Sequence, residues 1–372
     1  MDTERKRKIL FAINDLGYGG GQLTVVHEAN LFFKNGHDVK VLLFLPREKQ
    51  ELADFLIIPK ENVSIIPFKS FFDAGSFIKL IKFLKANKPD VILSNLFFTN
   101  FMTRTAKLFF PRIKVFVREG NVPVEKSLWM KIFDFKASFL TKKIIVNAAA
   151  IKESFIKELK IPARKMEVIY NGIDEKFFKK NDFRDKRKDF GLKKDDFVLI
   201  NVSSMNSVKK GHSYLIEIAE KLVKNNSDKI KLVMVGDGKR KKELEKMAYD
   251  RGISGNVLFA GGQNDVEKWL GMADVFVLTS LWEGMPNAML EAMAMGLPAV
   301  AFNVGGVEEA LEDGVNGFLI KPEDQNGFIG GVLEIMANRE LRGVMSKRAI
   351  ETAERFTWSN HFEQLEKLIC AE

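Results

Sequence analysis

Short apolar segments rich in β-branched residues alternate with helical patterns along the whole chain. A repeated order of strand and helix predicts parallel sheets covered by helices on both faces, which is the α/β class. The chain has 372 residues, which is long for one hydrophobic core, so two such domains are expected. The predicted strands are residues 8–14, 38–45, 91–94, 114–117, 143–146 and 165–169, then 197–203, 231–235, 257–260, 275–279, 298–302 and 317–320.

Helical patterns fill the intervals between these strands, for instance over residues 20–34 and 149–159. Residues 181–196 are charged, poor in aliphatic side chains and without a clear period, which favours a linker. We therefore place the first domain at residues 1–178 and the second at residues 179–355.

The stretch 280–298 is the most informative for function, because it places Glu283 and Glu291 around the start of a predicted helix. Pro286 suits the first helical position, where its missing N–H costs nothing. Glu291 lies about 7 Å further along the helix axis, so it cannot contact the same atoms as Glu283. Unpaired amides at this helix start would face a phosphate, and they belong to Asn287, Ala288 and Met289. An anion site between two carboxylates suits a sugar–diphosphate–ribose ligand.

A glycine-rich loop follows the first predicted strand and contains Gly19, Gly20 and Gly21. Consecutive glycines allow positive φ and a close approach of the backbone to a ligand. A dinucleotide-binding dehydrogenase is not favoured, because the last glycine of its fingerprint would fall on Gln22. The strand 38–45 also ends without the acidic residue that binds a ribose in those enzymes.

These motifs together resemble the retaining glycosyltransferases of family 4, which have the GT-B fold. Residues 280–298 resemble the Glu-x7-Glu motif of that family, and residues 171–174 (Asn-Gly-Ile-Asp) resemble its signature at the domain crossover. Residues 235–238 and 305–309 resemble two of its later turns. The resemblance implies two Rossmann-like domains facing each other across a cleft, the first binding the acceptor and the second the nucleotide sugar. It also implies that a last helix, within residues 356–372, returns to the first domain.

The resemblance assigns roles to several side chains. Glu283 would hold hydroxyls of the transferred hexose and Glu291 the hydroxyls of the ribose. Lys210 would grip the diphosphate, with Lys209 as a neighbouring candidate. We take Glu283 and Lys210 as the catalytic candidates, because charge that builds up on the leaving diphosphate needs electrostatic stabilisation. The remaining donor-binding candidates are Gly19, Gly20, Gly21, Ser204, Gly238, Gly284, Pro286 and the amides of Asn287, Ala288 and Met289.

Two positions depart from the pattern of the family. Ser204 stands where the family has an arginine, so the bidentate grip of a guanidinium is missing. Gly120 stands where related enzymes often carry a histidine that reaches the donor sugar. Arg118, Glu119 and Asn121 surround this glycine at the end of a strand, and we expect them on the acceptor side.

The expected activity is retaining transfer of a hexose or N-acetylhexosamine from a nucleotide-diphosphate sugar. The expected acceptor is a glycan or a polyprenyl-linked sugar in the synthesis of cell-surface polysaccharide or lipopolysaccharide. We expect no metal and no cofactor beyond the co-substrate. The two departures keep open a non-catalytic partner subunit that binds nucleotide sugars. A GT-B sugar epimerase is a further alternative, and the intact Glu-x7-Glu motif argues against it.

Composition excludes several other classes. The net charge is +9, but it is scattered and accompanies no nucleic-acid motif, so a nucleic-acid partner is not expected. No apolar run is long enough to span a bilayer, and residues 1–8 lack the apolar core of a signal peptide. The single cysteine, Cys370, suits a reducing compartment. We therefore expect a cytoplasmic protein.

Residues 68–88 interleave Phe, Ile and Leu with Lys79, Lys82 and Lys85 at helical spacing. A basic amphipathic helix of this kind either lies on an anionic membrane surface or packs on the core with a solvated lysine face. In the first case the protein would be peripheral on the inner face of the cell membrane, and Phe71, Phe72 or Phe77 would enter the interface.

Overall fold

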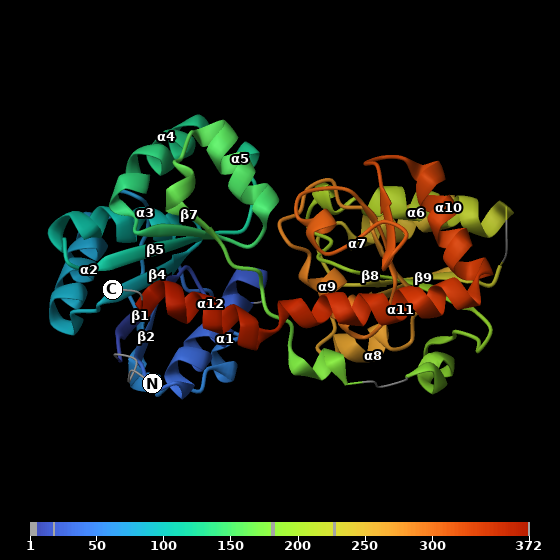
Figure 1. The fold of residues 1–372 in the computed structure, drawn as a ribbon, viewed down its shortest axis with the longest axis horizontal. Helices are drawn as coiled ribbons and strands as arrows, with labels where there is room; N and C mark the ends of the chain where they lie inside the picture. Colours follow the sequence, from blue (N-terminus) through green and yellow to red (C-terminus); the bar gives the residue numbers. More distant parts are fainter. Residues whose placement is uncertain (1–5, 18, 180–182, 226–227, 371–372) are drawn as a thin grey trace. The chain divides into compact units, whose positions relative to one another are not determined.

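A computed structural model describes residues 6–17, 19–179, 183–225 and 228–370. The chain divides into two compact units, the first comprising Met1–Gly172 with Trp358–Glu372 and the second Ile173–Thr357. The first crossover therefore lies between Gly172 and Ile173, and residues 173–178, which we placed in the first domain, belong to the second unit. The fold of each unit can be followed in Figure 1.

The first unit is built on a parallel sheet of seven strands in the order β3-β2-β1-β4-β5-β6-β7. Apolar residues fill these strands because both faces of the sheet are covered. The strands are β1 (Lys8–Ile13), β2 (Asp38–Leu43), β3 (Val63–Ile65), β4 (Val91–Asn95), β5 (Lys114–Glu119), β6 (Lys143–Val146) and β7 (Met166–Val168).

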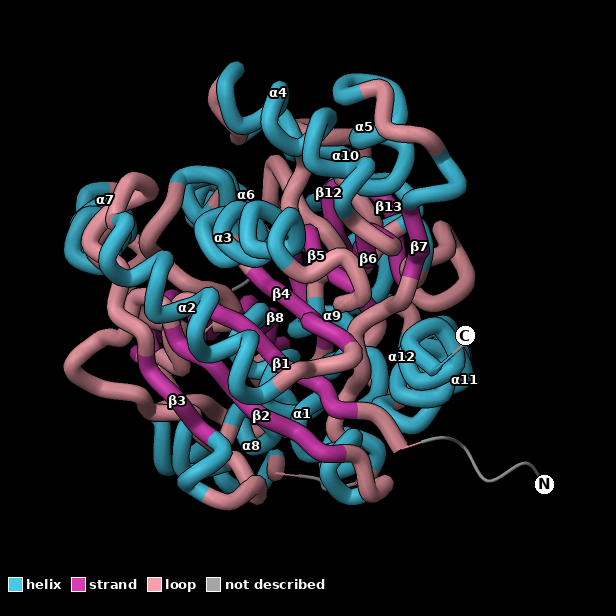
Figure 2. Tube along the Cα trace, turned by 90° about the vertical axis from the view of Figure 1, so that its left-hand side faces the viewer, coloured by secondary structure: helices cyan, strands magenta, loops and turns pink. Residues whose placement is uncertain are grey.

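Helices cover both faces of the first sheet. They are α1 (Gly20–Lys34), α2 (Ala74–Asn87), α3 (Phe97–Ala106), α4 (Leu128–Ala137), α5 (Ala149–Leu159) and α12 (Trp358–Cys370). Side chains of α1 and α12 share one core cluster with the sheet, and those of α2, α3 and α5 share another. Figure 2 shows α1 and α12 side by side, away from α2 and α3. The ring of Trp358 stacks on His27 at a centroid distance of 4.4 Å, which joins α12 to α1.

The second unit has a parallel sheet of six strands in the order β10-β9-β8-β11-β12-β13. The strands are β8 (Phe197–Val202), β9 (Ile230–Val235), β10 (Val257–Gly261), β11 (Val275–Leu278), β12 (Ala299–Phe302) and β13 (Gly317–Ile320). The helices are α6 (His212–Asn225), α7 (Lys241–Asp250), α8 (Val266–Leu270), α9 (Asn287–Ala294), α10 (Gln325–Ala337) and α11 (Arg339–Ala353). Side chains of α6, α7 and α10 share a large core cluster with the strands.

Short 3-10 turns connect many of these elements. In the first unit they are Ala53–Phe55, Lys60–Asn62, Lys107–Phe109, Pro123–Glu125, Ser138–Leu140 and Ala163–Lys165. In the second they are Glu175–Phe178, Arg184–Phe190, Val208–Lys210, Val307–Glu309 and Glu354–Phe356. None of the helices in the described parts of the chain combines the length and apolar composition that crossing a membrane requires.

The prediction of a linker at residues 181–196 is wrong for its described part, residues 183–196. Arg187 is buried there, and its Nε donates to the carbonyl of Met272 at 2.8 Å. Its Nη2 donates to Oδ2 of Asp274, also at 2.8 Å. The charges that made the segment look solvated therefore hold it against the second unit. Residues 181 and 182 lie outside the described residues.

Candidate active site

The candidate donor residues of the second unit lie on loops at the carboxyl edge of its sheet. β8 and β11 are parallel neighbours, so the loops that follow them emerge at the same edge. The amide of Leu281 donates to the carbonyl of Lys209 at 2.7 Å, which ties these two loops together. The loop after β12 joins them, because the amide of Gly306 donates to the carbonyl of Gly284 at 2.9 Å. Backbone bonds thus bring three loops together at the site.

Lys210 and Glu283, the two predicted catalytic residues, are in direct contact. Lys210 Nζ lies 2.7 Å from Glu283 Oε1, and 24% and 9% of the two side chains are exposed. A partly buried ion pair holds its members in place better than a solvated pair, because fewer competing waters reach it. The pair therefore presents a preoriented cation at the sheet edge, next to a carboxylate.

Two glycines permit this close approach of loops. Gly211 has φ +66°, and a Cβ at that position would lie 1.8 Å from the carbonyl oxygen of Thr279. Gly305 has φ +56°, and a Cβ there would lie 1.9 Å from the carbonyl oxygen of Glu283. A side chain at either position would force the loop that carries Glu283 away from its neighbours.

The structure corrects the helix start that we predicted for this site. α9 begins at Asn287, and Pro286 is its N-cap residue. The carbonyl of Pro286 accepts hydrogen bonds from the amides of Met289 at 3.0 Å and Leu290 at 3.3 Å. The first turn therefore closes early, and the prediction of an unpaired amide at Met289 is wrong. Ala288 and Asn287 remain at the tip of the helix, where the dipole favours an anion.

Glu291 lies one turn into α9 and is half-buried, while its neighbours Leu290 and Ala292 are fully enclosed. Burial raises the pKa of its carboxyl to about 7, and the cation of Lys176 offsets only part of this effect. Asp174 and Glu267 add to the increase. The charged form of this carboxyl therefore lacks the cations and hydrogen-bond donors that a buried charge needs. A carboxylate that binds the hydroxyl groups of a ligand is expected to have this property.

His212 contacts the segment that follows β8, at the carboxyl edge of the second sheet. It is fully buried at the start of α6, and its Nε2 lies 2.8 Å from the hydroxyl of Ser203. Burial, followed by the charges of Arg240 and Lys210, lowers the pKa of His212 to about 4. The imidazole is therefore neutral near pH 7, and it positions the end of β8 without adding charge to the site.

Ser204 lies exposed directly after β8, where its hydroxyl accepts a hydrogen bond from Asn206 Nδ2 at 2.9 Å. Gly238, in the next loop, packs on the same segment, since a Cβ there would lie 2.4 Å from the carbonyl carbon of Met205. Both predicted donor residues thus stand at the sheet edge that carries Lys210.

We expect Ser204→Arg to leave nucleotide binding intact or to tighten it. Ser204 is exposed, so a guanidinium has room there and adds a bidentate phosphate ligand. Titration of the full chain with a panel of nucleoside diphosphates, before and after the change, measures the effect, and Ser204→Gln serves as an uncharged control. Severe loss of nucleotide binding in a folded arginine variant would contradict this assignment.

In the first unit, the glycine-rich loop leads directly into α1. Gly19 is the N-cap residue with an extended backbone (φ 178°), and neither Gly20 nor Gly21 has a positive φ. The expectation that these glycines adopt positive φ angles is therefore wrong. A Cβ at Gly19 would lie 2.4 Å from Gln22 Oε1, whereas Gly20 has open space around it. The loop thus leaves room for a ligand at Gly20.

Arg118 and Glu119, predicted on the acceptor side, are both buried at the end of β5. The guanidinium of Arg118 pairs with Glu28 of α1. Glu28 in turn lies 2.8 Å from Nε2 of His361 on α12. Arg118 therefore links β5, α1 and α12, and its charge is already compensated within the unit.

Glu119 belongs to a second buried network. Its Oε2 lies 2.8 Å from Lys126 Nζ, and Lys126 lies 2.6 Å from Asp134. Asp134 also pairs with Arg104 at 2.7 Å. Burial acts against the charge of Lys126, but Glu119 and Asp134 outweigh it and raise the pKa of the ammonium. Asn121 is exposed just beyond these residues, so among the three predicted acceptor residues it is the one accessible to a ligand.

Phe72, which the sequence predicted at a membrane interface, belongs to a larger exposed apolar surface whose α4 members the sequence analysis missed. We call it the apolar patch; its exposed members are Phe72, Leu128, Trp129, Ile132 and Phe135. Phe72 is 93% exposed. The ring of the adjacent Phe71 lies 5.4 Å from that of Trp129, which connects the two halves of the patch. The sequence did contain a signal for this surface, because the helical period of α4 places apolar residues on more than one side of the helix.

Comparison with known proteins agrees with this geometry. The profile "Glycosyltransferase Family 4" matches residues 18–177, and "Glycosyl transferases group 1" matches residues 182–352. The chain is 31% identical to an Escherichia coli enzyme over 88% of this chain and 87% of that one. That enzyme is described as a UDP-Gal:alpha-D-GlcNAc-diphosphoundecaprenol alpha-1,3-galactosyltransferase. The chain belongs to the family 4 (group 1) glycosyltransferases. The family inferred from the motifs is thereby confirmed.

This glycosyltransferase is also similar to a second curated enzyme and to a solved structure. A Campylobacter jejuni N-acetylgalactosaminyltransferase, described as acting on a diphospho-undecaprenol-linked acceptor, is 26% identical over 80% of both chains. The structure of Anabaena Alr3699/HepE in complex with UDP has a TM-score of 0.87 at 23% identity, covering 98% of this chain and all of that one. The two parallel-sheet units and these neighbours confirm the GT-B fold. Among the described residues, no group of three or more His, Cys, Asp or Glu side chains is placed to hold a metal.

Proposed function

We propose that this glycosyltransferase moves a hexose or N-acetylhexosamine from a uridine-diphosphate sugar to a polyprenyl-linked or glycan acceptor, with retention of anomeric configuration. The observation that carries the proposal is the ion pair of Lys210 and Glu283 beside the start of α9. The printed names of relatives support the donor and acceptor classes, since they specify UDP-galactose and diphosphoundecaprenol. A role in cell-surface polysaccharide synthesis follows from such an acceptor.

The arrangement suits a reaction whose leaving group accumulates negative charge. As the glycosidic bond of the donor breaks, the electron pair goes to the diphosphate oxygen. The ammonium of Lys210 and the positive end of the α9 dipole stabilise that charge, and such preorganised groups contribute strongly to catalysis. Glu283 orients the sugar hydroxyls, and Glu291 binds the ribose. The oxygen of the acceptor hydroxyl forms the new bond to the anomeric carbon, and its proton goes to the departing diphosphate oxygen, so neither carboxylate acts as a general base in this proposal.

A screen of nucleotide sugars by thermal unfolding tests the donor assignment. A ligand that binds only the native state raises the free energy of unfolding, and the increase grows with the ratio of the ligand concentration to Kd. The increase is about 2.7 kcal/mol when the concentration is a hundred times Kd. We expect one UDP-sugar to raise the Tm of the full chain more than its ADP and GDP counterparts do. Equal shifts with all nucleotides would contradict a uridine-specific donor site.

A non-catalytic partner subunit is the second candidate, because Ser204 and Gly120 replace two ligands that the family pattern supplies. Such a subunit would bind the same nucleotide sugar without turnover. Release of UDP in the presence of an acceptor separates the two functions.

Contact with a membrane surface is part of the proposal, since a polyprenyl-linked acceptor presents its sugar there. In the structure α2 buries Leu80 and Leu84 in the core, and Lys79, Lys82 and Lys85 are exposed on its outer face. The helix is thus core-packed with a lysine face. Phe71 and Phe77 are half-buried, so the apolar patch, with Phe72 and Trp129, replaces them as the element that enters the interface.

We expect the full chain to bind anionic vesicles and to bind neutral vesicles far less. Each lysine near such a surface contributes about 1 kcal/mol, and salt screens this attraction. Changing Lys79, Lys82 and Lys85 to Glu should abolish co-sedimentation with phosphatidylglycerol vesicles. The matched control carries the same change at Lys221, Lys242 and Lys347, exposed lysines of the second unit. Equal loss in both variants, or equal binding to both lipid types, would contradict docking through α2.

A further inference from the structure

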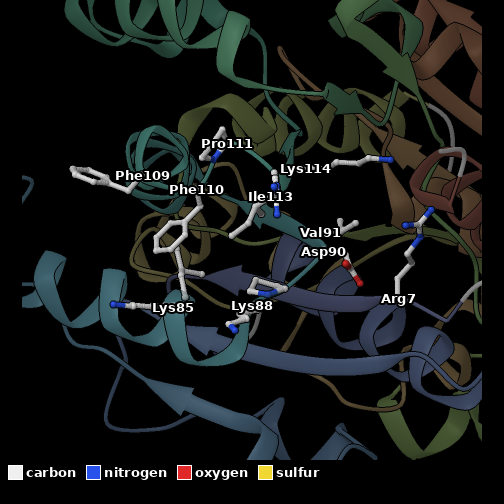
Figure 3. A pocket seen from close by; sticks show the side chains of 13 residues that line it. Arg7, Lys85, Lys88, Asp90, Val91, Phe109, Phe110, Pro111, Ile113 and Lys114 are labelled. Atoms are coloured by element: carbon white, nitrogen blue, oxygen red, sulfur yellow. The ribbon is translucent and has the colours of Figure 1, made fainter.

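A cavity of about 470 Å³ lies in the first unit at the amino edge of its sheet (Figure 3). Its walls come from the starts of β4 and β5, the last turn of α2 and residues 109–113. The glycine-rich loop and Asn121 follow the carboxyl ends of β1 and β5, which are parallel to β4. The cavity is therefore at the opposite edge of this sheet from the glycine-rich loop and Asn121, the candidate ligand-binding residues of the first unit, and it is separate from them.

The wall of the cavity is mainly apolar. Its size falls within the range of small-molecule sites, about 300–1,000 Å³. Lys107 holds the segment that forms one side of the cavity. Its ammonium donates to the carbonyl of Pro111 at 2.7 Å and also to that of Ile113. Phe109 is 61% exposed and so reaches solvent. The apolar side chains that line the cavity are Leu84, Pro89, Val91, Phe109, Phe110, Pro111 and Ile113.

Cations dominate the polar part of the lining. They are Arg7, Lys85, Lys88, Arg112 and Lys114. Among the described residues of the lining, Asp90 is the only acidic one, and its carboxylate accepts a hydrogen bond from the amide of Lys8 at 2.8 Å. Figure 3 shows Arg7 and Lys114 toward one end of the cavity and Lys85 with Phe109 toward the other. Cationic side chains therefore outnumber carboxylates among the described residues around an apolar space.

Arg7 adds an independent observation. Its Nη2 donates to the carbonyl of Cys370 at 3.3 Å, but its Nε is buried and has no hydrogen-bond partner among the described residues. A buried donor without an acceptor costs free energy. An anionic oxygen in the cavity would supply the missing acceptor and would meet the surrounding cations.

We propose that this cavity binds the alkyl chain of an amphipathic anion, whose phosphate or carboxylate head is held by the cationic residues of the rim. The chemistry is that of a single-chain alkyl phosphate or a fatty acid. Such a ligand comes either from an anionic lipid of the bilayer or free from solution. Lys85 belongs both to the cavity and to the lysine face of α2, so a lipid surface on that face would deliver the ligand directly.

Calorimetric titration of the full chain with dodecyl phosphate, below its micelle concentration, tests the site. We expect saturable binding of one molecule. Decyl phosphate should bind more weakly, by about fourfold for each fully buried methylene removed. Glycerol phosphate, which has the head without the chain, and dodecyl maltoside, which has the chain without the charge, should both bind poorly. Absence of saturable binding, or affinity independent of chain length, would overturn the proposal.

A pair of double variants tests the charge of the rim. Lys88→Asn with Arg112→Asn should weaken dodecyl phosphate binding by more than about tenfold, because two charge-assisted contacts are lost. Both residues are exposed, and asparagine tolerates the left-handed backbone of Lys88 (φ 45°). The control, Lys79→Asn with Lys82→Asn, removes the same charge from α2 outside the cavity and should bind within about twofold of the unchanged chain. Equal losses in both pairs would show general charge attraction only and would overturn the site.

Vesicle binding by the Lys88→Asn, Arg112→Asn chain identifies the source of the ligand, with Lys221→Asn, Lys242→Asn in the second unit as the control. If binding to phosphatidylglycerol vesicles falls more with Lys88→Asn and Arg112→Asn than with this control, the ligand is a bilayer lipid. If vesicle binding is the same for both pairs while dodecyl phosphate binding falls with Lys88→Asn and Arg112→Asn, the ligand is a soluble amphiphile. Either result requires that the cavity bind the probe.

Discussion

Replacing Glu291 with glutamine is expected to remove most of the affinity for the UDP-sugar donor while the protein stays folded. The carboxyl is half-buried on α9, and in the proposed complex it accepts hydrogen bonds from the ribose. Loss of a hydrogen bond to a charged group costs about 1.5–3 kcal/mol, or roughly ten- to a hundredfold in Kd. Titration with the donor found in the thermal screen measures the effect, and Glu334→Gln, at an exposed position of α10, is the matched control.

The pH dependence of stability gives this variant a second readout. Burial raises the pKa of Glu291 from 4.5 to about 7. As pH rises from 4.5 through 7, the unfolded chain releases this proton while the native protein retains it, so the native state loses stability. The loss is at most about 3 kcal/mol and is complete above pH 7.

Glu291→Gln lacks this titration. Its free energy of unfolding, relative to the unchanged chain, should therefore increase between pH 4.5 and pH 8, as measured by urea denaturation at both values. A variant that binds donor normally would contradict the ribose assignment. A pH-independent difference in stability would contradict the raised pKa.

Replacing Lys210 with alanine is expected to lower kcat/KM by roughly 10²–10³, the range seen when one preorganised charge stabiliser is removed. The ammonium lies 2.7 Å from Glu283, so its loss also leaves that carboxylate without its cation. Glu283→Gln keeps the shape of the side chain and should mainly impair sugar orientation. Lys242→Ala, at an exposed position of α7, serves as the control and should retain normal turnover. A Lys210→Ala variant with unchanged turnover would remove the pair from the mechanism.

The sequence predicted the sheets better than the loops between them. Buried parallel strands have continuous apolar runs, so β11 (Val275–Leu278) and β12 (Ala299–Phe302) were located within about a residue. β3 (Val63–Ile65) was missed because it has three residues, none of them fully buried. The described part of residues 181–196 was misread as a linker, since a buried arginine such as Arg187 is recognisable only through its distant partner Asp274.

The site was predictable where local sequence determines geometry. The turn before α9 and the glycines around it placed Glu283 and Lys210 at one sheet edge. Their direct ion pair was not predicted, because they are 73 residues apart in sequence and only the strand order brings them together. The same limit applies to Arg118, whose partner Glu28 lies on another element. The amide of Met289 was misassigned because helix starts shift by a residue with the geometry of the cap.

Transfer of sugar from a UDP-sugar to an acceptor is the most direct test of the account. The full chain would be incubated with a panel of UDP-hexoses and UDP-N-acetylhexosamines and a polyprenyl-diphosphate-linked N-acetylglucosamine. The mass of the product would be measured by mass spectrometry and its anomeric configuration by NMR. We expect one donor to give an acceptor heavier by one sugar, with an equal amount of UDP and an α-linkage retained from the donor. We expect the Lys210→Ala chain to form little of it. A donor that binds tightly while neither UDP nor a glycosylated acceptor appears would contradict the proposed transfer.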